Sequence, residues 1–258
     1  MEKRHGRFSW YQVNATDAAA ARDFYCDIAG WQAQDIAMQD GSNYIMLGTD
    51  HGPIGGIMSL PDEARKAGAP QHWLSYVTTP DIDATLMQAR DHDAQVYVPP
   101  TELSDGRFAV LADPQGALFA LFTPNVVDED TPFAPQPGDI SWHELMTTDH
   151  KAALAFYWEL FGWEKLSAHD MGDMGIYQEF GRQGVALGGM YDKPPELQAP
   201  SHWLLYIMVP NVEERIERIT ELGGKVLRGP MEVPGGDLVA QCLDPQGGVF
   251  AIHATAQS

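Results

Sequence analysis

The sequence has few cysteines, few basic residues and no long apolar run. Its only cysteines are Cys26 and Cys242, which excludes a disulfide framework and a cysteine-rich zinc site. The 16 Lys and Arg stand against 36 Asp and Glu, a formal net charge of −20. Such a surface would repel nucleic acids and anionic membranes. No apolar stretch reaches the roughly 18 residues that a membrane-spanning helix needs.

The first residues also lack the pattern of a signal peptide. Met1–Arg7 is charged, but no apolar segment follows it. We therefore expect a cytoplasmic protein that takes a small molecule as partner, without nucleic acid or membrane. We expect the arm Met1–Gly6 to fray.

The chain instead contains a long internal repeat. Ser9–Trp31 and Ser141–Trp163 carry the same residue at 10 of 23 aligned positions. The block H-W-L-x-Y occurs at His72 and again at His202. The block D-P-Q-G-x-x-F-A occurs at Asp113 and again at Asp244. Three blocks in one order, 130 to 132 positions apart, indicate a tandem duplication of a unit of roughly 120 residues.

Each repeat reads as two modules of one strand, one helix and three short strands. In the first module the strand Phe8–Asn14 precedes a helix that Thr16–Asp17 can cap and Gly30 can end. The helix stripe consists of Ala21, Phe24, Tyr25 and Ile28. Further strands are predicted at Tyr44–Leu47, Ile54–Leu60, His72–Thr78, Val96–Val98, Arg107–Leu111 and Ala117–Phe122, and a further helix at Asp81–Asp91.

A segment rich in proline and acidic residues separates the repeats. Pro61–Pro70 is expected to be a polar connection inside the first repeat, whereas residues 124–138 read as an extended linker. We therefore predict an α+β protein with two tandem domains, 1–123 and 139–258. Each is built of paired βαβββ modules whose sheets curl into an open cup. We expect a monomer, with a dimer as the alternative, because one chain already supplies the paired modules.

These features resemble the vicinal oxygen chelate superfamily, which includes glyoxalase I, extradiol dioxygenases and bleomycin-resistance proteins. The resemblance rests on D-x-x-x-A-x-x-F-Y-x-x-x-x-G-W, at Asp17 and Asp149, and on D-P-x-G-x-x-F, at Asp113 and Asp244. It covers nearly the whole chain, twice, and is closest to the branch with tandem domains. It implies the fold named above, but it does not select one activity, because the superfamily spans several chemistries.

The resemblance also implies positions for metal ligands, and this sequence departs from them. Where metal-dependent members carry His, Gln or Glu, this chain has tryptophan, leucine and alanine, which offer a divalent cation no lone pair. The positions are Trp10, Leu74 and Ala120 in the first repeat and Trp142, Leu204 and Ala251 in the second. The usual metal sites are therefore predicted to be absent, and no cofactor is expected.

A shifted metal site in the second domain is the alternative. Residues two apart on a strand share a face, which would place Glu144 beside Trp142 and His253 beside Ala251. With Glu179 and His202, these side chains could bind one divalent ion. Glu144 and Glu179 are also the candidate catalytic residues. The competing interpretation of His72 and His202 is structural, as hydrogen-bonding residues at strand starts, and His143 is expected to be structural too.

Two function hypotheses follow. The first is a protein like the bleomycin-resistance members, which binds a small planar or apolar molecule in aromatic-lined cups. Its candidate ligand-binding residues are Trp10, Gln12, Tyr76, Trp142, Glu144, Tyr206 and His253. The second is a metal-dependent lyase, isomerase or dioxygenase that uses the shifted site. Core packing is the competing role for Trp10 and Trp142, and it is the expected role of Trp31 and Trp163.

Overall fold

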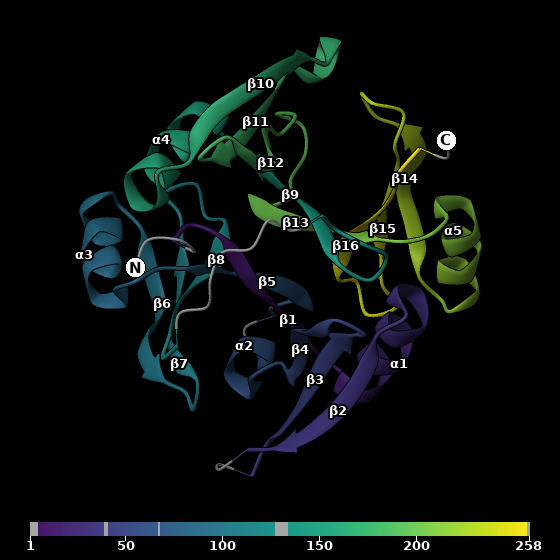
Figure 1. The fold of residues 1–258 in the computed structure, drawn as a ribbon, viewed down its shortest axis with the longest axis horizontal. Coiled ribbons are helices and arrows are strands. Elements are labelled where there is room, and N and C mark those ends of the chain that lie inside the picture. The colour runs from purple at the N-terminus through teal and green to yellow at the C-terminus, as the bar shows by residue number, and fades with distance from the viewer. Residues whose placement is uncertain (1–4, 39–40, 67, 127–133, 257–258) are drawn as a thin grey trace. The chain divides into compact units, whose positions relative to one another are not determined.

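A computed structural model of the chain describes residues 5–38, 41–66, 68–126 and 134–256 (Figure 1). The first repeat forms an eight-stranded sheet with the strand order β2-β3-β4-β1-β5-β8-β7-β6. Its strands are β1 (Phe8–Ala15), β2 (Gln32–Ala37), β3 (Asn43–Thr49), β4 (Gly52–Ser59), β5 (His72–Thr78), β6 (Gln95–Glu102), β7 (Gly106–Ala112) and β8 (Leu118–Pro124). Its helices are α1 (Ala18–Ala29), α2 (Asp62–Lys66) and α3 (Ile82–Asp91).

The second repeat forms a sheet of the same order, β10-β11-β12-β9-β13-β16-β15-β14. Its strands are β9 (Ile140–Thr147), β10 (Glu164–Asp170), β11 (Ile176–Arg182), β12 (Val185–Asp192), β13 (His202–Met208), β14 (Lys225–Glu232), β15 (Leu238–Leu243) and β16 (Val249–Ala254). Its helices are α4 (His150–Phe161), the short 3-10 helix η1 (Gly172–Met174) and α5 (Val212–Glu221). Parallel pairing joins β1 to β4, β5 to β8, β9 to β12 and β13 to β16, whereas the hairpins are antiparallel. The predicted α+β class with tandem βαβββ modules is confirmed.

The caps of the first helix are as predicted. The Asp17 side chain accepts a hydrogen bond from the Ala20 amide at 3.0 Å. Gly30 ends the helix at φ +73°, in the left-handed region that favours glycine. The predicted stripe is the buried face of α1, and α4 repeats the arrangement between Asp149 and Gly162.

Three predictions about local structure were incomplete or wrong. Strand β2 was missed because its residues are almost all exposed and carry no apolar alternation. Helix α2 lies within the segment expected to be a connection. Gly6 does not fray: it is buried, its amide donates to the Thr78 carbonyl at 2.8 Å, and its carbonyl accepts from Trp163 Nε1 at 2.7 Å. Residues 1–4 of this arm lie outside the described part of the chain.

The predicted linker is also only partly described. Residues 127–133 lie outside the described part, and β8 extends as far as Pro124. At the far end, the Gly138 amide donates to the Met208 carbonyl at 2.8 Å. The Gly138 carbonyl accepts from Trp31 Nε1 at 2.6 Å. The last residue of this segment is therefore held by hydrogen bonds to its amide and its carbonyl.

Contacts divide the chain into two compact units, each built from parts of both repeats. Unit 1 consists of the described residues of Met1–Trp10, Ser75–Phe133 and Trp142–Trp203. Unit 2 consists of the described residues of Tyr11–Leu74, Ala134–Ser141 and Leu204–Ser258. Helices α3 and α4 pack together in unit 1, and α1 and α5 pack together in unit 2. Each unit thus combines a first module of one repeat with a second module of the other.

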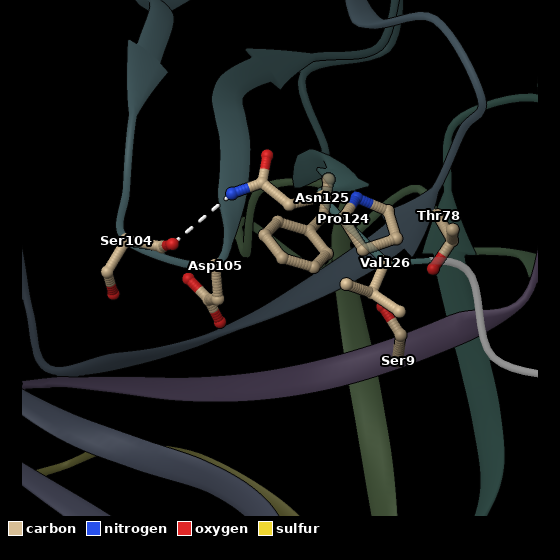
Figure 2. A pocket seen from close by; sticks show the side chains of 8 residues that line it. Ser9, Thr78, Ser104, Asp105, Pro124, Asn125 and Val126 are labelled. Atoms are coloured by element: carbon tan, nitrogen blue, oxygen red, sulfur yellow. Dashed lines mark hydrogen bonds between the residues drawn. The ribbon is translucent and has the colours of Figure 1, made fainter.

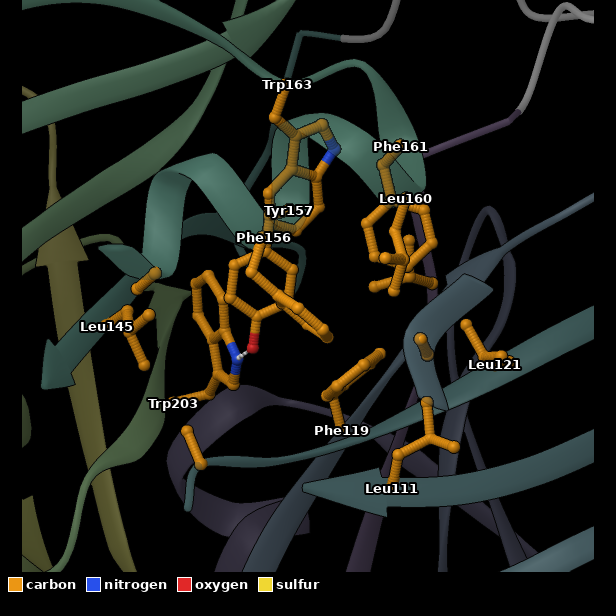
Figure 3. Packing of buried hydrophobic residues seen from close by; sticks show 14 of the residues in the cluster. Leu111, Phe119, Leu121, Leu145, Phe156, Tyr157, Leu160, Phe161, Trp163 and Trp203 are labelled. Carbon is orange, nitrogen blue, oxygen red and sulfur yellow. Dashed lines mark hydrogen bonds between the residues drawn. The ribbon is translucent and has the colours of Figure 1, made fainter. Parts of the chain in front are cut away.

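The core of unit 1 is dense in aromatic side chains (Figure 3). Trp163 is fully buried and stacks on Phe180, with ring centroids 4.6 Å apart. Phe119 from β8 meets Tyr157 from α4 edge to face at 5.4 Å. Such rings bury large apolar areas and fix mutual orientation. Within the described residues, no helix is long and apolar enough to cross a bilayer.

Candidate functional site

One face of the sheet formed by β9 to β12 carries polar and aromatic side chains together. Strand alternation places Leu145, Phe180 and Met190 in the core with helix α4. The alternate residues lie on the opposite face, which we call the β9–β12 face. They are Trp142, Glu144, Tyr177, Glu179 and Tyr191. The strand register sets Glu144 and Glu179 on either side of Gly189.

A hydrogen-bonded chain connects three of these residues. Trp142 Nε1 donates to the Tyr177 hydroxyl at 2.8 Å. That hydroxyl is hydrogen-bonded in turn to the Glu144 carboxylate. Burial, and then the charge of Glu144, raise the pKa of Tyr177 well above its ordinary value, so its hydroxyl stays protonated and donates. Glu144 itself is only 7% exposed, which makes it a buried carboxylate within an aromatic surface.

Three residues that the sequence analysis did not select shape this face. Tyr177 stacks on Tyr191, with centroids 6.1 Å apart and planes at 22°. Gly189 leaves room for the Tyr177 ring, because a Cβ there would lie 2.1 Å from it. The internal repeat could have indicated this pair, because Tyr44 and Gly56 occupy the matching positions 133 residues earlier. A Cβ at Gly56 would likewise lie 2.3 Å from the Tyr44 ring.

Glu179, a candidate catalytic residue, has a different partner. Its Oε1 lies 2.9 Å from His169 Nε2, and both side chains are partly exposed. Since a carboxylate only accepts, the imidazole donates in this pair. The Glu179 carboxylate therefore accepts a hydrogen bond from His169.

Two further candidates, Trp10 and Tyr76, belong to unit 1. Trp10 is half-buried near the start of β1. Tyr76 is 5% exposed and packs against Phe108, with centroids 6.2 Å apart. The structure thus connects Trp142 with Glu144 and gives Tyr76 a packing contact.

Unit 2 holds the remaining three candidates. Gln12 Nε2 donates to Asn14 Oδ1 at 2.9 Å. The Tyr206 hydroxyl accepts from Gln241 Nε2 at 3.3 Å. His253 contacts Ser141 Oγ through Nδ1 at 2.9 Å and Asp237 through Nε2 at 3.0 Å.

The histidines at strand starts have structural contacts, as the second interpretation predicted. His72 Nδ1 donates to the Pro70 carbonyl at 2.9 Å, and His202 Nδ1 donates to the Pro200 carbonyl at 3.0 Å. His143 is buried, contacts the Leu187 carbonyl at 2.9 Å and stacks on Phe8 at 3.7 Å. Burial lowers the pKa of His143 to about 4, so this imidazole is neutral at pH 7.

The residues at the family's metal-ligand positions do not fit a divalent ion. Trp142 directs its indole N–H, a donor without a lone pair, toward Tyr177. Leu204 and Ala251 are buried hydrocarbon side chains. Across the described residues, no group of three or more His, Cys, Asp or Glu side chains is arranged to hold a metal ion.

Unit 1 also contains a hollow of about 360 Å³ (Figure 2). It is lined by Ser9, Thr78, Ser104, Asp105, Phe122, Pro124, Asn125 and Val126. Asn125 Nδ2 donates to the Ser104 carbonyl at its edge at 3.2 Å. The Ser9 hydroxyl is buried without a hydrogen-bond partner among the described residues. None of the predicted site residues lines this hollow.

Comparison with known proteins gives relatives over nearly the whole chain. The "Putative glyoxylase CFP32" of Mycobacterium tuberculosis is 29% identical over 255 residues, covering 97% of this chain and 95% of the relative. "Anthracycline biosynthesis protein DnrV" of Streptomyces peucetius is 28% identical, covering 96% of this chain and 92% of the relative.

Solved structures share the fold at low identity. The Mn(II)-bound glyoxalase from Novosphingobium aromaticivorans has a TM-score of 0.65 at 17% identity, covering 98% of this chain and 83% of that one. The 2,3-dioxygenase LapB from Pseudomonas sp. KL28 has a TM-score of 0.66 at 13% identity, covering 98% of this chain and 94% of that one. The family model that matches residues 7–121 and 139–252 shows that the chain belongs to the Glyoxalase/Bleomycin resistance protein/Dioxygenase superfamily.

Proposed function

We propose that this chain binds a planar aromatic molecule on the β9–β12 face. The observation that carries the proposal is the buried Glu144 carboxylate, hydrogen-bonded to Tyr177 within an aromatic surface. Small-molecule sites typically combine apolar and aromatic walls with a few polar groups that fix orientation. Glu144 can accept a hydrogen bond from a hydroxyl or amine on the ligand.

The geometry supports a flat ligand in particular. The ring contacts and hydrogen bonds of Tyr177 hold its position on the face before any ligand arrives. Rings fixed in this way lose little side-chain entropy when a second ring stacks on them. Two relatives are named for the biosynthesis of anthracyclines, which are planar polycyclic aromatic compounds. That naming agrees with the proposed ligand class.

Calorimetric titration with an anthracycline aglycone would test the proposal. We expect one saturable site per chain, because the first repeat has Gln12 in place of Glu144. Trp142→Phe and Glu144→Gln should each weaken binding roughly tenfold, the effect of losing about 1.4 kcal/mol of interaction. Trp158→Phe is the matched control, since Trp158 is 55% exposed on α4 and does not lie on the β9–β12 face. Equal affinity of all three variants and the parent would refute the assignment.

We base the proposed partner and location on composition. The acidic net charge supports a small molecule, rather than nucleic acid or an anionic membrane, as the partner. We infer a cytoplasmic monomer, in which the two repeats of one chain supply the module pairs found in each unit.

A further inference from the structure

We infer that Ser141, His253 and Asp237 form a nucleophilic site for hydrolysis of small esters. The three side chains make one continuous hydrogen-bonded chain within unit 2. Ser141 Oγ lies 2.9 Å from His253 Nδ1, and His253 Nε2 lies 3.0 Å from Asp237 Oδ2. An activated serine is recognised by two contacts: its hydroxyl is hydrogen-bonded to a base, and a carboxylate orients that base.

The contacts fix which nitrogen of His253 carries the proton. The Ala256 amide donates to Asp237 Oδ1 at 2.9 Å, and this contact, followed by that of His253, holds the pKa of the carboxyl below its usual range. An ionised carboxylate only accepts, so His253 Nε2 carries the hydrogen that faces Asp237. With the hydrogen on Nε2 alone, the Nδ1 lone pair faces Ser141 Oγ and can accept the hydroxyl proton.

The first repeat shows that the fold does not need this cluster. The matching positions are Ser9, Phe122 and Gly106, and the corresponding strands β7 and β8 form with the same register. A Cβ at Gly106 would lie 2.8 Å from the Phe122 ring. The first repeat thus has Phe122 and Gly106 at the positions where the second has His253 and Asp237. The hydrogen-bonded chain belongs to the second repeat alone, and a shared structural role does not explain it.

Exposure is compatible with access to a small substrate. Ser141 is half-buried, and the side chains of His253 and Asp237 are 14% and 33% exposed. The Tyr206 carbonyl, 3.3 Å from Ser141 Oγ, is a second and more distant acceptor for the same hydroxyl hydrogen.

The reaction balances with water as the only co-reactant. Ser141 Oγ attacks the ester carbonyl carbon while its proton passes to His253 Nδ1. The bond to the alkoxy group breaks, and the leaving alcohol takes that proton. Water then attacks the acyl-serine and gives one proton to Nδ1. The acyl–Oγ bond breaks, the proton returns to Oγ, and a carboxylic acid leaves. Asp237 stabilises the imidazolium that forms in both steps.

The full-length protein can be tested with p-nitrophenyl acetate and a fluorophosphonate probe. We expect slow esterase activity and a probe adduct that peptide mass spectrometry places on Ser141. Ser141→Ala should abolish the adduct and lower the esterase rate at least tenfold, and Asp237→Asn should lower it to a smaller extent. Ser9→Ala is the matched control and should leave both unchanged.

A second measurement separates activation from simple hydrogen bonding. Ser141→Cys places a thiol beside His253, whereas Ser9→Cys places one beside Phe122. Alkylation by iodoacetamide should be at least tenfold faster at position 141, because a neighbouring imidazole favours the reactive thiolate. An adduct elsewhere, an unchanged esterase rate in Ser141→Ala, or equal alkylation of the two thiols would overturn the inference.

Discussion

The Tyr157 hydroxyl donates a hydrogen bond to Asp113 Oδ2 at 3.0 Å, although the two residues belong to different repeats. Trp203 Nε1 donates to the same hydroxyl at 3.0 Å. Unit 2 repeats the arrangement, with Tyr25 donating to Asp244 at 2.6 Å and Trp73 donating to Tyr25 at 3.0 Å. In each core, the three repeated sequence blocks therefore meet. Each block contributes one polar side-chain atom to a buried network of two hydrogen bonds.

Removal of the Tyr157 hydroxyl should destabilise the protein. In Tyr157→Phe, buried Asp113 loses a donor and the Trp203 N–H loses its acceptor. We expect the free energy of unfolding to fall by about 1–3 kcal/mol, measured by urea denaturation. Tyr97→Phe, at a position 57% exposed, should change it by less than about 0.5 kcal/mol. Equal effects of the two substitutions would show that the buried chain contributes nothing measurable.

His143 should make stability fall in mild acid. Burial lowers its folded-state pKa to about 4 from an ordinary value of 6.5, so between these values the unfolded chain binds the proton and the folded chain does not. Its contribution is complete above about pH 6.5 and is lost as the pH falls toward 4. The size is roughly 3 kcal/mol.

Urea denaturation between pH 7 and pH 4.5 would measure this effect. His143→Gln, which keeps a donor for the Leu187 carbonyl, should have a flatter stability profile than the parent over this range. The exposed His92 offers the control, because His92→Gln should retain the parent's pH dependence. A parental slope in His143→Gln would contradict the assignment.

Gly189 should control the shape of the β9–β12 face. In Gly189→Ala the new methyl would collide with the Tyr177 ring, and the ring would have to move away from Trp142 and Glu144. We expect the affinity for the aglycone to fall about tenfold. Gly56→Ala imposes the same collision on Tyr44 in unit 2 and should leave that affinity unchanged. The reverse result would place the ligand on the first repeat.

The protein should bind no divalent ion stoichiometrically. Tryptophan, leucine and alanine occupy the family's ligand positions and supply no lone pairs. After dialysis against zinc, nickel, manganese and iron(II), elemental mass spectrometry should find well under one ion per chain. About one ion per chain, lost in Glu144→Ala, would instead support the shifted site and a metal-dependent enzyme.

The sequence predicted the modules well, because their boundaries are set by local chemistry. Asp17 caps the first helix and Gly30 ends it through contacts within a few residues, and both do so as expected. Gly6 was mispredicted, because its order depends on Thr78 and Trp163, which are distant in the chain. Strand β2 was missed because its polar residues show no alternation. It forms a strand by pairing with β3.

The pairing of the repeats could not be predicted from the motifs. By sequence, Asp113 and Asp244 are equivalent candidate partners for Tyr25, because each begins a D-P-Q-G block. Only the structure shows that the partner is Asp244. The sequence analysis named His253 as a candidate ligand-binding residue, but Asp237 lies in a turn sequence, and no motif connects it to Ser141.

The exchange of modules between repeats gives the linker a thermodynamic role. If the polypeptide were cut at the linker, the first fragment would carry Tyr25 and Asp113, and the second would carry Tyr157 and Asp244. Each tyrosine would then be separated from the aspartate to which it donates. Neither fragment could complete a core without a second molecule. In one polypeptide that association is intramolecular, so it does not depend on the concentration of a second molecule. The tandem duplication thus makes the stability of each core independent of protein concentration.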